Sequence, residues 1–208
     1  SKTMNLFFDR LGVMKKLLGI IILGLFLITP SQADDIRDFQ IEGISVGDSL
    51  LDYLIKKKIE KDKIFYPDRK YFRAILFDNN DDNYPDSELF NTIFGVAKSG
   101  DKKYIIHSLE AFIPFENNID GCLKKKKEIL NDVSQLFPNA ASTERKGKHP
   151  SDKTKKSIAY QVIYKILNQG YIEITCFDMS IESGQLDSLA VAIYTKKFDK
   201  YLKDEAFK

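Results

Sequence analysis

The sequence predicts an α+β fold, an antiparallel sheet with about three helices packed on it. Runs rich in aromatic and β-branched residues recur between loops of hairpin length, and such short connections join antiparallel strands. A parallel β-α-β array needs a helix between successive strands, and most strand pairs in this sequence have none. The order of helix, strands, helix and strands also indicates a duplicated unit, although no sequence repeat accompanies it.

Residues 1–33 have the pattern of a secretory signal peptide. A pair of lysines follows Met14, the apolar run 17–28 comes next, and Ser31 and Ala33 provide the small residues of a cleavage site after Ala33. The apolar run is shorter than the roughly 20 residues that a membrane-spanning helix needs. The sequence therefore predicts a periplasmic or secreted protein, with an N-terminal membrane anchor as the alternative if the leader is not cleaved.

Residues 34–208 are predicted to form a single α+β domain, long enough to bury a core without help. Residues 1–13 are interpreted either as an upstream extension of a chain that begins at Met14 or as part of a longer basic region of the leader. The net charge of the whole chain is +2, and the leader contributes more basic than acidic residues. A near-neutral domain gives no electrostatic reason to expect a nucleic-acid partner.

The sequence of the first half of the domain predicts one helix among several strands. Ser49 and Asp52 form a capping box, in which the serine bonds an amide of the first turn and the aspartate reaches back, so a helix is expected over 49–60. A Ser-Gly-Asp turn between two β-rich runs predicts a hairpin. Alternation and β-propensity predict these strands: 38–42, 71–77, 89–97 and 103–115.

The second half begins with the longest predicted helix, from Asp120 as its N-cap to Phe137, just before a proline. Lys126 falls within the apolar stripe of this helix, and snorkelling of its aliphatic stem is the preferred interpretation over a buried ligand-binding role. The apolar side chains of the stripe recur at the helical spacing: Cys122, Leu123, Ile129, Leu130, Val133, Leu136 and Phe137.

Three strands and a short amphipathic helix complete the domain, at 158–167, 171–177, 189–195 and 196–207. The polar stretch 139–157 has no periodicity and is predicted to be a mobile surface loop. Its basic residues could contact anionic lipid or polysaccharide, but a solvated linker is favoured. These residues are Arg145, Lys146, Lys148, Lys153, Lys155 and Lys156.

The segment GISVG, residues 43–47, matches the G-x-S-x-G nucleophile elbow of serine hydrolases at Ser45. In those enzymes several strands precede the nucleophile, whereas Ser45 lies shortly after Ala33 and no HGGG-like oxyanion segment is present. The later histidines are His107, in a predicted strand, and His149, in the polar stretch. A structural turn is therefore preferred, with a secreted serine hydrolase using Ser45 as the alternative, and no catalytic residue is predicted.

An acidic loop in the first half of the domain partly matches a calcium-binding EF-hand loop. Asp78, Asn80 and Asp82 occupy its first three ligand positions, but Asn83 replaces the required glycine and Leu89 stands where a bidentate glutamate is needed. A solvated turn is favoured over a weak Ca²⁺ site. Because the His and Cys spacings fit no zinc motif and no P-loop or dinucleotide fingerprint occurs, neither a metal nor a cofactor is predicted.

Cys122 and Cys176 are predicted to form a disulfide bond. Export places the chain in an oxidising compartment, where an even pair of cysteines is expected to bridge. Cys122 lies on the apolar face of its predicted helix, and Cys176 shares strand parity with Ile172 and Ile174, so both thiols should face the same core. Two buried free thiols are the alternative.

Two short segments, IEGISVGDSLLDYL and LAVAIYTKKFDKYL, resemble small exported bacterial proteins without assigned function. The G-x-S-x-G-D-S-L-L-D helix entry also resembles the start of SmpA/OmlA-type envelope lipoproteins. That resemblance implies helices on a small antiparallel sheet and a role in outer-membrane assembly. The chain departs from those lipoproteins because it has no lipobox cysteine and no second Gly-x-Pro signature after the first helix. The resulting expectation is a non-enzymatic envelope module that binds a protein, a glycan or a lipid.

Overall fold

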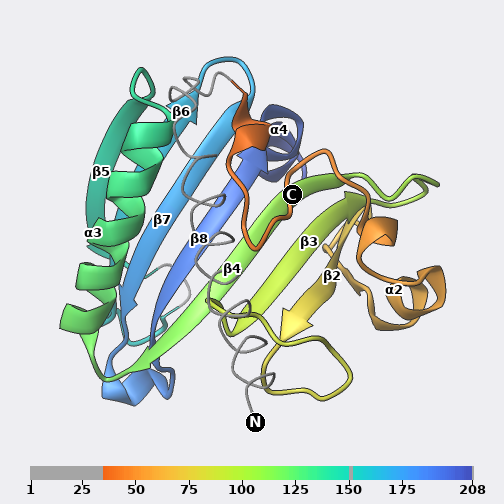
Figure 1. Cartoon of the computed structure of the whole chain (residues 1–208). Helices are drawn as coiled ribbons and strands as arrows, with labels where there is room; N and C mark the ends of the chain where they lie inside the picture. The colour runs from red at the N-terminus through yellow and green to blue at the C-terminus, as the bar shows by residue number, and fades with distance from the viewer. Residues whose placement is uncertain (1–34, 150–151, 208) are drawn as a thin grey trace, which may run out of the picture. The chain divides into compact units, whose positions relative to one another are not determined.

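One antiparallel sheet, with the strand order β1-β2-β3-β4-β8-β7-β6-β5, organises the residues described by the computed structural model, 35–149 and 152–207 (Figure 1). Aromatic and β-branched residues dominate most of its strands, as the sequence indicated. The strands are β1 Ile64–Phe65, β2 Tyr71–Asp78, β3 Thr92–Lys98, β4 Ile106–Glu116, β5 Ala141–Lys148, β6 Ile158–Ile166, β7 Gly170–Asp178 and β8 Asp187–Thr195.

Three α-helices accompany the sheet within the described residues: α2 Lys56–Asp62, α3 Ile119–Leu136 and α4 Lys196–Asp204. Three short 3₁₀ helices complete the elements: η2 Ile36–Asp38, η3 Leu50–Asp52 and η4 Ile181–Ser183. The predicted class, α+β with an antiparallel sheet and helices packed on it, is confirmed.

The sheet consists of two four-stranded meanders that meet in the middle. β1 to β4 run inward from one edge in chain order, and β5 to β8 run inward from the other edge. β4 and β8 pair antiparallel at the junction, with Ser108 opposite Tyr194 and Phe112 opposite Ala190. The helix–strands–helix–strands order of the sequence thus corresponds to two halves of one sheet, with α3 as the connection between them.

One face of the sheet is covered along most of its width, and we call it the closed face. α3 packs on β7 and β8, while segment 36–54 packs over β2 to β4, and both belong to one apolar core. Leu50 lies so close to β3 that a Cβ atom at Gly95 would be 2.6 Å from its Cδ2 atom. The buried strand residues of this face include Phe72, Leu76, Ile93, Leu109, Ala111, Ile172, Ile174, Cys176, Leu189, Val191 and Ile193.

The opposite side, which we call the open face, is covered by α4 only at one end. Phe198 and Tyr201 of α4 form a separate small core with Tyr71 and Val96. Figure 1 shows α4 on the other side of the sheet from α3. Beyond α4, most side chains of this face are half-buried, and they include Arg73, Ile75, Phe94, Phe112, Glu173, Phe177, Ala190 and Tyr194.

The predicted strand over 38–42 is wrong. Residues Ile36–Asp38 form η2 instead, and Ile41 makes only an isolated bridge with Ile44. The side chain of Asp35 accepts a hydrogen bond from the Arg37 amide and caps η2. The alternation that indicated a strand is that of Phe39 and Ile41, which both pack into the closed-face core without forming a strand.

The predicted helix over 49–60 is broken in two. The Ser49–Asp52 capping box is present, but it begins only the 3₁₀ helix η3, and α2 starts at Lys56. The Leu50 amide donates to the Tyr104 carbonyl oxygen over 3.0 Å, so this backbone pairs with the segment leading into β4. The break lies at Ile55, whose extended backbone (φ −69°, ψ 142°) separates η3 from α2.

The predicted mobile loop over 139–157 is also wrong, because residues 141–148 form β5. All eight of its residues pair in register with β6, from Ala141 opposite Lys165 to Lys148 opposite Ile158. Every side chain of β5 is exposed, since it is an edge strand with no cover on either face. It therefore has no apolar alternation by which the sequence could reveal it.

The ends of the other elements shift by only a few residues. α3 begins two residues earlier than predicted, because its N-cap is Asn118, whose side chain accepts from the Gly121 amide, rather than Asp120. The predicted leader over 1–33 lies outside the described residues. None of the helices formed by the described residues combines the length and hydropathy needed to cross a membrane.

Candidate functional site

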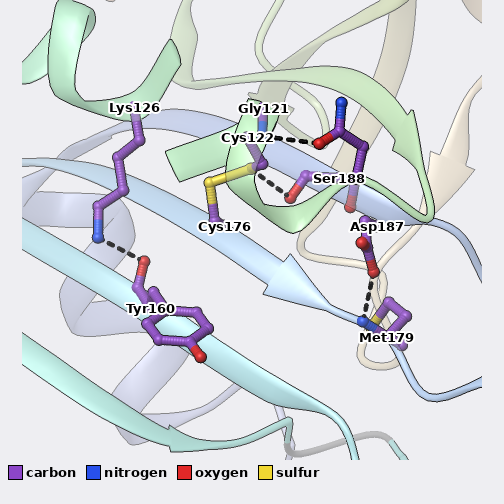
Figure 2. The surroundings of a disulfide bond; sticks show 9 residues. Gly121, Cys122, Lys126, Tyr160, Cys176, Met179, Asp187 and Ser188 are labelled. Carbon is purple, nitrogen blue, oxygen red and sulfur yellow. Dashed lines mark hydrogen bonds between the residues drawn. A yellow bond between two sulfur atoms is a disulfide. The ribbon is translucent and has the colours of Figure 1, made fainter. Parts of the chain in front are cut away.

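Cys122 and Cys176 meet under α3, as the sequence led us to expect, and Figure 2 shows the bond between their sulfur atoms. Cys122 lies in the first turn of α3 and Cys176 on the closed face of β7. Their Cα atoms are 6.0 Å apart, within the usual range for disulfides. Both residues are fully buried, so the pair links the helix to the sheet and offers no accessible redox group.

Lys126 is buried one turn further along α3, which differs from the expected snorkelling. Its Nζ atom donates to the Tyr160 carbonyl oxygen on β6 over 2.7 Å (Figure 2). Burial lowers the pKa of this ammonium group, because the charged form loses hydration. The interaction ties α3 to β6 on the closed face.

The contacts of Ser45 give its hydroxyl group a structural role. It is 6% exposed, and its Oγ atom donates to the Arg37 carbonyl oxygen over 2.7 Å. Its amide donates to a carboxylate oxygen of Asp48, which holds the turn. His107 on β4 instead packs its ring edge-on against Tyr71, with 5.6 Å between ring centroids. The hydroxyl proton of Ser45 is thus committed to a backbone oxygen.

Polar side chains of the acidic loop after β2 form hydrogen bonds within the loop. Asp78 accepts from the Asn80 amide and Asp81 accepts from the Asn83 amide, each within a local turn. Within the described residues, no group of three His, Cys, Asp or Glu side chains has the arrangement of a metal site. The basic residues Arg145, Lys146 and Lys148 project from the exposed edge strand β5.

A hollow near the end of α3 has few polar groups that could select a ligand. It has a volume of about 410 Å³ and lies between Phe137 and Leu167. Its lining is mainly apolar, and Asn139 and Lys165 are its polar residues. The open face, in contrast, has a cavity lined by several charged residues.

A cavity of about 140 Å³ opens on the centre of the open face. Its floor is β8, where Ala190 and Ala192 leave a depression between the larger side chains of β4 and β7. The rings of Phe112 and Phe177 stand on either side of these alanines. The full lining comprises Arg73, Glu110, Phe112, Glu173, Phe177, Ala190, Val191, Ala192 and Tyr194.

Arg73 and Glu110 form a partly buried ion pair in this cavity. The Nη2 atom of Arg73 lies 2.7 Å from Oε2 of Glu110, whose side chain is only 6% exposed. The guanidinium carbon lies 5.5 Å from the centre of the Phe94 ring and 5.8 Å from that of Tyr66. These cation–π contacts and the ion pair hold the Arg73 head over the first half of the sheet.

Glu173 approaches the same cavity from β7, on the other side of the β8 floor. Glu110 and Glu173 both stand opposite Ala192, in one row across three strands. The Thr175 hydroxyl donates to Oε1 of Glu173 over 3.2 Å and orients the carboxylate. Tyr171 and Tyr194 stack beside it, with 4.8 Å between ring centroids. The cavity thus combines two carboxylates with one guanidinium.

The electrostatics of the cavity reflect this arrangement. Burial raises the pKa of Glu110, and the nearby Glu173 adds to the rise, while Arg73 opposes it. Burial also raises the pKa of Tyr194, with further contributions from both glutamates. These shifts reflect the burial of the two side chains and the proximity of two carboxylates and one guanidinium in the cavity.

Sequence reasoning missed this site, although a signal was present. Arg73, Glu110 and Glu173 are each an isolated charge within an apolar strand: YFRAILF, SLEAF and YIEITCF. Ionised groups are costly to bury, so a lone charge in such a run marks a paired or functional position. What the sequence lacks is the strand order that brings these three residues together.

Comparisons with protein-family models, curated proteins and solved structures gave no significant match for this chain.

Proposed function

We propose that the protein is an exported, non-enzymatic binding module whose ligand contacts the open face of the sheet. The proposal rests on the difference between the two faces of the sheet in how far helices and loops cover them. α3 and segment 36–54 close one face, whereas α4 leaves the centre of the other face accessible, with a cavity lined by charged residues. Concave sites with apolar walls and a few oriented polar groups are the usual form of ligand sites.

Two features support export. The sequence of the leader has the three parts of a signal peptide, and the disulfide between Cys122 and Cys176 is a kind of cross-link that persists in oxidising compartments. Both features support a location of the domain outside the cytoplasm. The periplasm or the cell surface is the proposed location.

The environment of Ser45 favours binding over hydrolysis. A serine nucleophile needs a base that accepts its proton, and here the Ser45 proton is directed to the Arg37 carbonyl oxygen. We expect that a fluorophosphonate probe will not label the folded protein. Labelling that disappears in Ser45→Ala would instead support the serine hydrolase.

Methyl NMR can test the proposed surface directly. Protein labelled at alanine methyl groups is titrated with an envelope extract of the organism that encodes it. Shifts should concentrate on Ala190 and Ala192 of the open face and leave Ala74 and Ala111 of the closed face unchanged. Changes confined to the closed face, or an unchanged spectrum at saturating extract, would contradict the proposal.

A further inference from the structure

We infer that the open-face cavity binds a small alkylammonium cation. This inference rests on the proposed function and specifies the chemistry of its ligand. It depends on three properties of the cavity: its charge, its aromatic walls and its size.

The charge of the cavity is complementary to a cation. Glu110 and Glu173 face each other across the β8 floor, and Arg73 alone opposes them. Arg73 already pairs with Glu110 over 2.7 Å, which leaves the Glu173 carboxylate as the group in excess. A cation between the two carboxylates would complete the pairing that a low-dielectric site favours.

The walls favour an organic cation over a hydrated metal ion. Phe112 and Phe177 flank the cavity, and Tyr194 closes one end. The faces of aromatic rings attract ammonium groups that carry methyl substituents, and such rings form the cages of known alkylammonium sites. Metal ions that prefer oxygen would need more oxygen ligands than two carboxylates and a hydroxyl provide.

The size sets the upper limit of the ligand. A volume of about 140 Å³ corresponds to roughly four or five water-sized groups, since one water occupies about 30 Å³ of liquid. Because the side chains of Ala190 and Ala192 are small, the cavity reaches down to the backbone of β8. A cation with a few methyl groups fills it, and a larger ligand can insert only such a group.

The test uses tetramethylammonium chloride as the probe and the alanine methyl groups of the floor as reporters. Ala190 and Ala192 should shift in a saturable manner in the purified full-length domain, at constant ionic strength. tert-Butanol has a similar shape without charge and should produce no saturable shift. Equal binding of tert-butanol would overturn the inference, because it would show a merely apolar hollow.

Two variants identify the groups responsible. Glu173→Gln should weaken tetramethylammonium binding about tenfold, which corresponds to about 1.4 kcal/mol. Phe112→Leu keeps an apolar wall without the ring and should weaken it several-fold. The matched control is Glu128→Gln, on the exposed surface of α3, which should bind as the parent does. Dispersed methyl spectra of each variant establish that it is folded.

The outcomes separate this inference from the proposed function. Unchanged affinity in a folded Glu173→Gln variant, or no saturable shift with tetramethylammonium in the parent protein, overturns the alkylammonium site. If the envelope extract still shifts Ala190 and Ala192 in that case, the open face remains a binding surface for another class of ligand. If neither titration affects these methyl groups, both proposals fail.

Discussion

The two faces of the sheet use the same strands for different purposes. On the closed face, residues such as Leu109 and Ile174 are fully buried, and a disulfide and a buried lysine tie the covering helix to the strands. On the open face, the neighbouring residues Glu110 and Thr175 are nearly as buried but polar, and the rings around them are half-exposed. Stability therefore concentrates on one face, which leaves the other free to carry a cluster of charged residues.

The largest expected effect comes from the disulfide of the closed face. Replacing Cys122 and Cys176 by alanine should lower the free energy of unfolding by about 4 kcal/mol, the chain-entropy value for a loop of this length. Urea unfolding measures it, and a reductant should destabilise the parent protein but not the double variant. Peptide mapping without reductant should recover the linked pair, and freely alkylated thiols in unreduced protein would contradict the bridge.

A pair of neighbouring residues on β4 sharpens the comparison. Leu109→Ala creates a cavity in the closed-face core and should cost about 2–5 kcal/mol. Phe112→Ala removes a larger but half-exposed side chain from the open face and should cost about 1 kcal/mol. Chemical denaturation of both variants provides the test. Equal losses would show that the open face contributes to the core as much as the closed face does.

Two strand glycines allow the same comparison with a single methyl group. Gly95→Ala places its Cβ atom 2.6 Å from buried Leu50 on the closed face, and overpacking should cost about 1–3 kcal/mol. Gly147→Ala on β5 meets no atom within 4 Å and should change stability by no more than about 0.5 kcal/mol. Thermal unfolding of the two variants checks both values, and a neutral Gly95→Ala would indicate that segment 36–54 is loosely packed.

The smallest effect concerns the pH dependence of the open face. The folded-state pKa of Glu110 is raised above its ordinary value near 4.5, chiefly by burial. Its contribution is therefore fully present below pH 4.5 and is lost as the pH rises through the folded-state pKa. Glu110→Gln should flatten the stability–pH profile above pH 4.5. A steeper profile would mean that the ion pair with Arg73, rather than burial, determines the pKa of Glu110.

Much of the fold follows from local patterns in the sequence. The strands of the central sheet have aromatic and β-branched runs, and strand parity together with the stripe of α3 was enough to pair Cys122 with Cys176. β5 could not be found in this way because it is exposed on both faces and contains no apolar period. The predicted helix over 49–60 was wrong because the backbone is extended at Ile55, between η3 and α2, and neither the capping box nor the apolar spacing indicates this break.

The candidate site could not be predicted, because it depends on strand order. Arg73, Glu110 and Glu173 belong to β2, β4 and β7, and only the pairing of β4 with β8 places the second and third across one floor. Hairpins can be inferred from turns, but nothing local indicates that the last strands of the two meanders meet. The isolated charges could have been noted, yet their convergence is a property of the assembled sheet.

The meeting of β4 and β8 also has a consequence for the order of synthesis. β4 is complete long before β8, so its inner edge lacks a partner while α3 and three further strands are made. Closing a pairing between such distant segments is slow, and an open strand edge invites pairing with another chain. A nascent or truncated chain that stops before Asp187 would present two unpaired edges, on β4 and β7, and would be prone to self-association until β8 fills the gap.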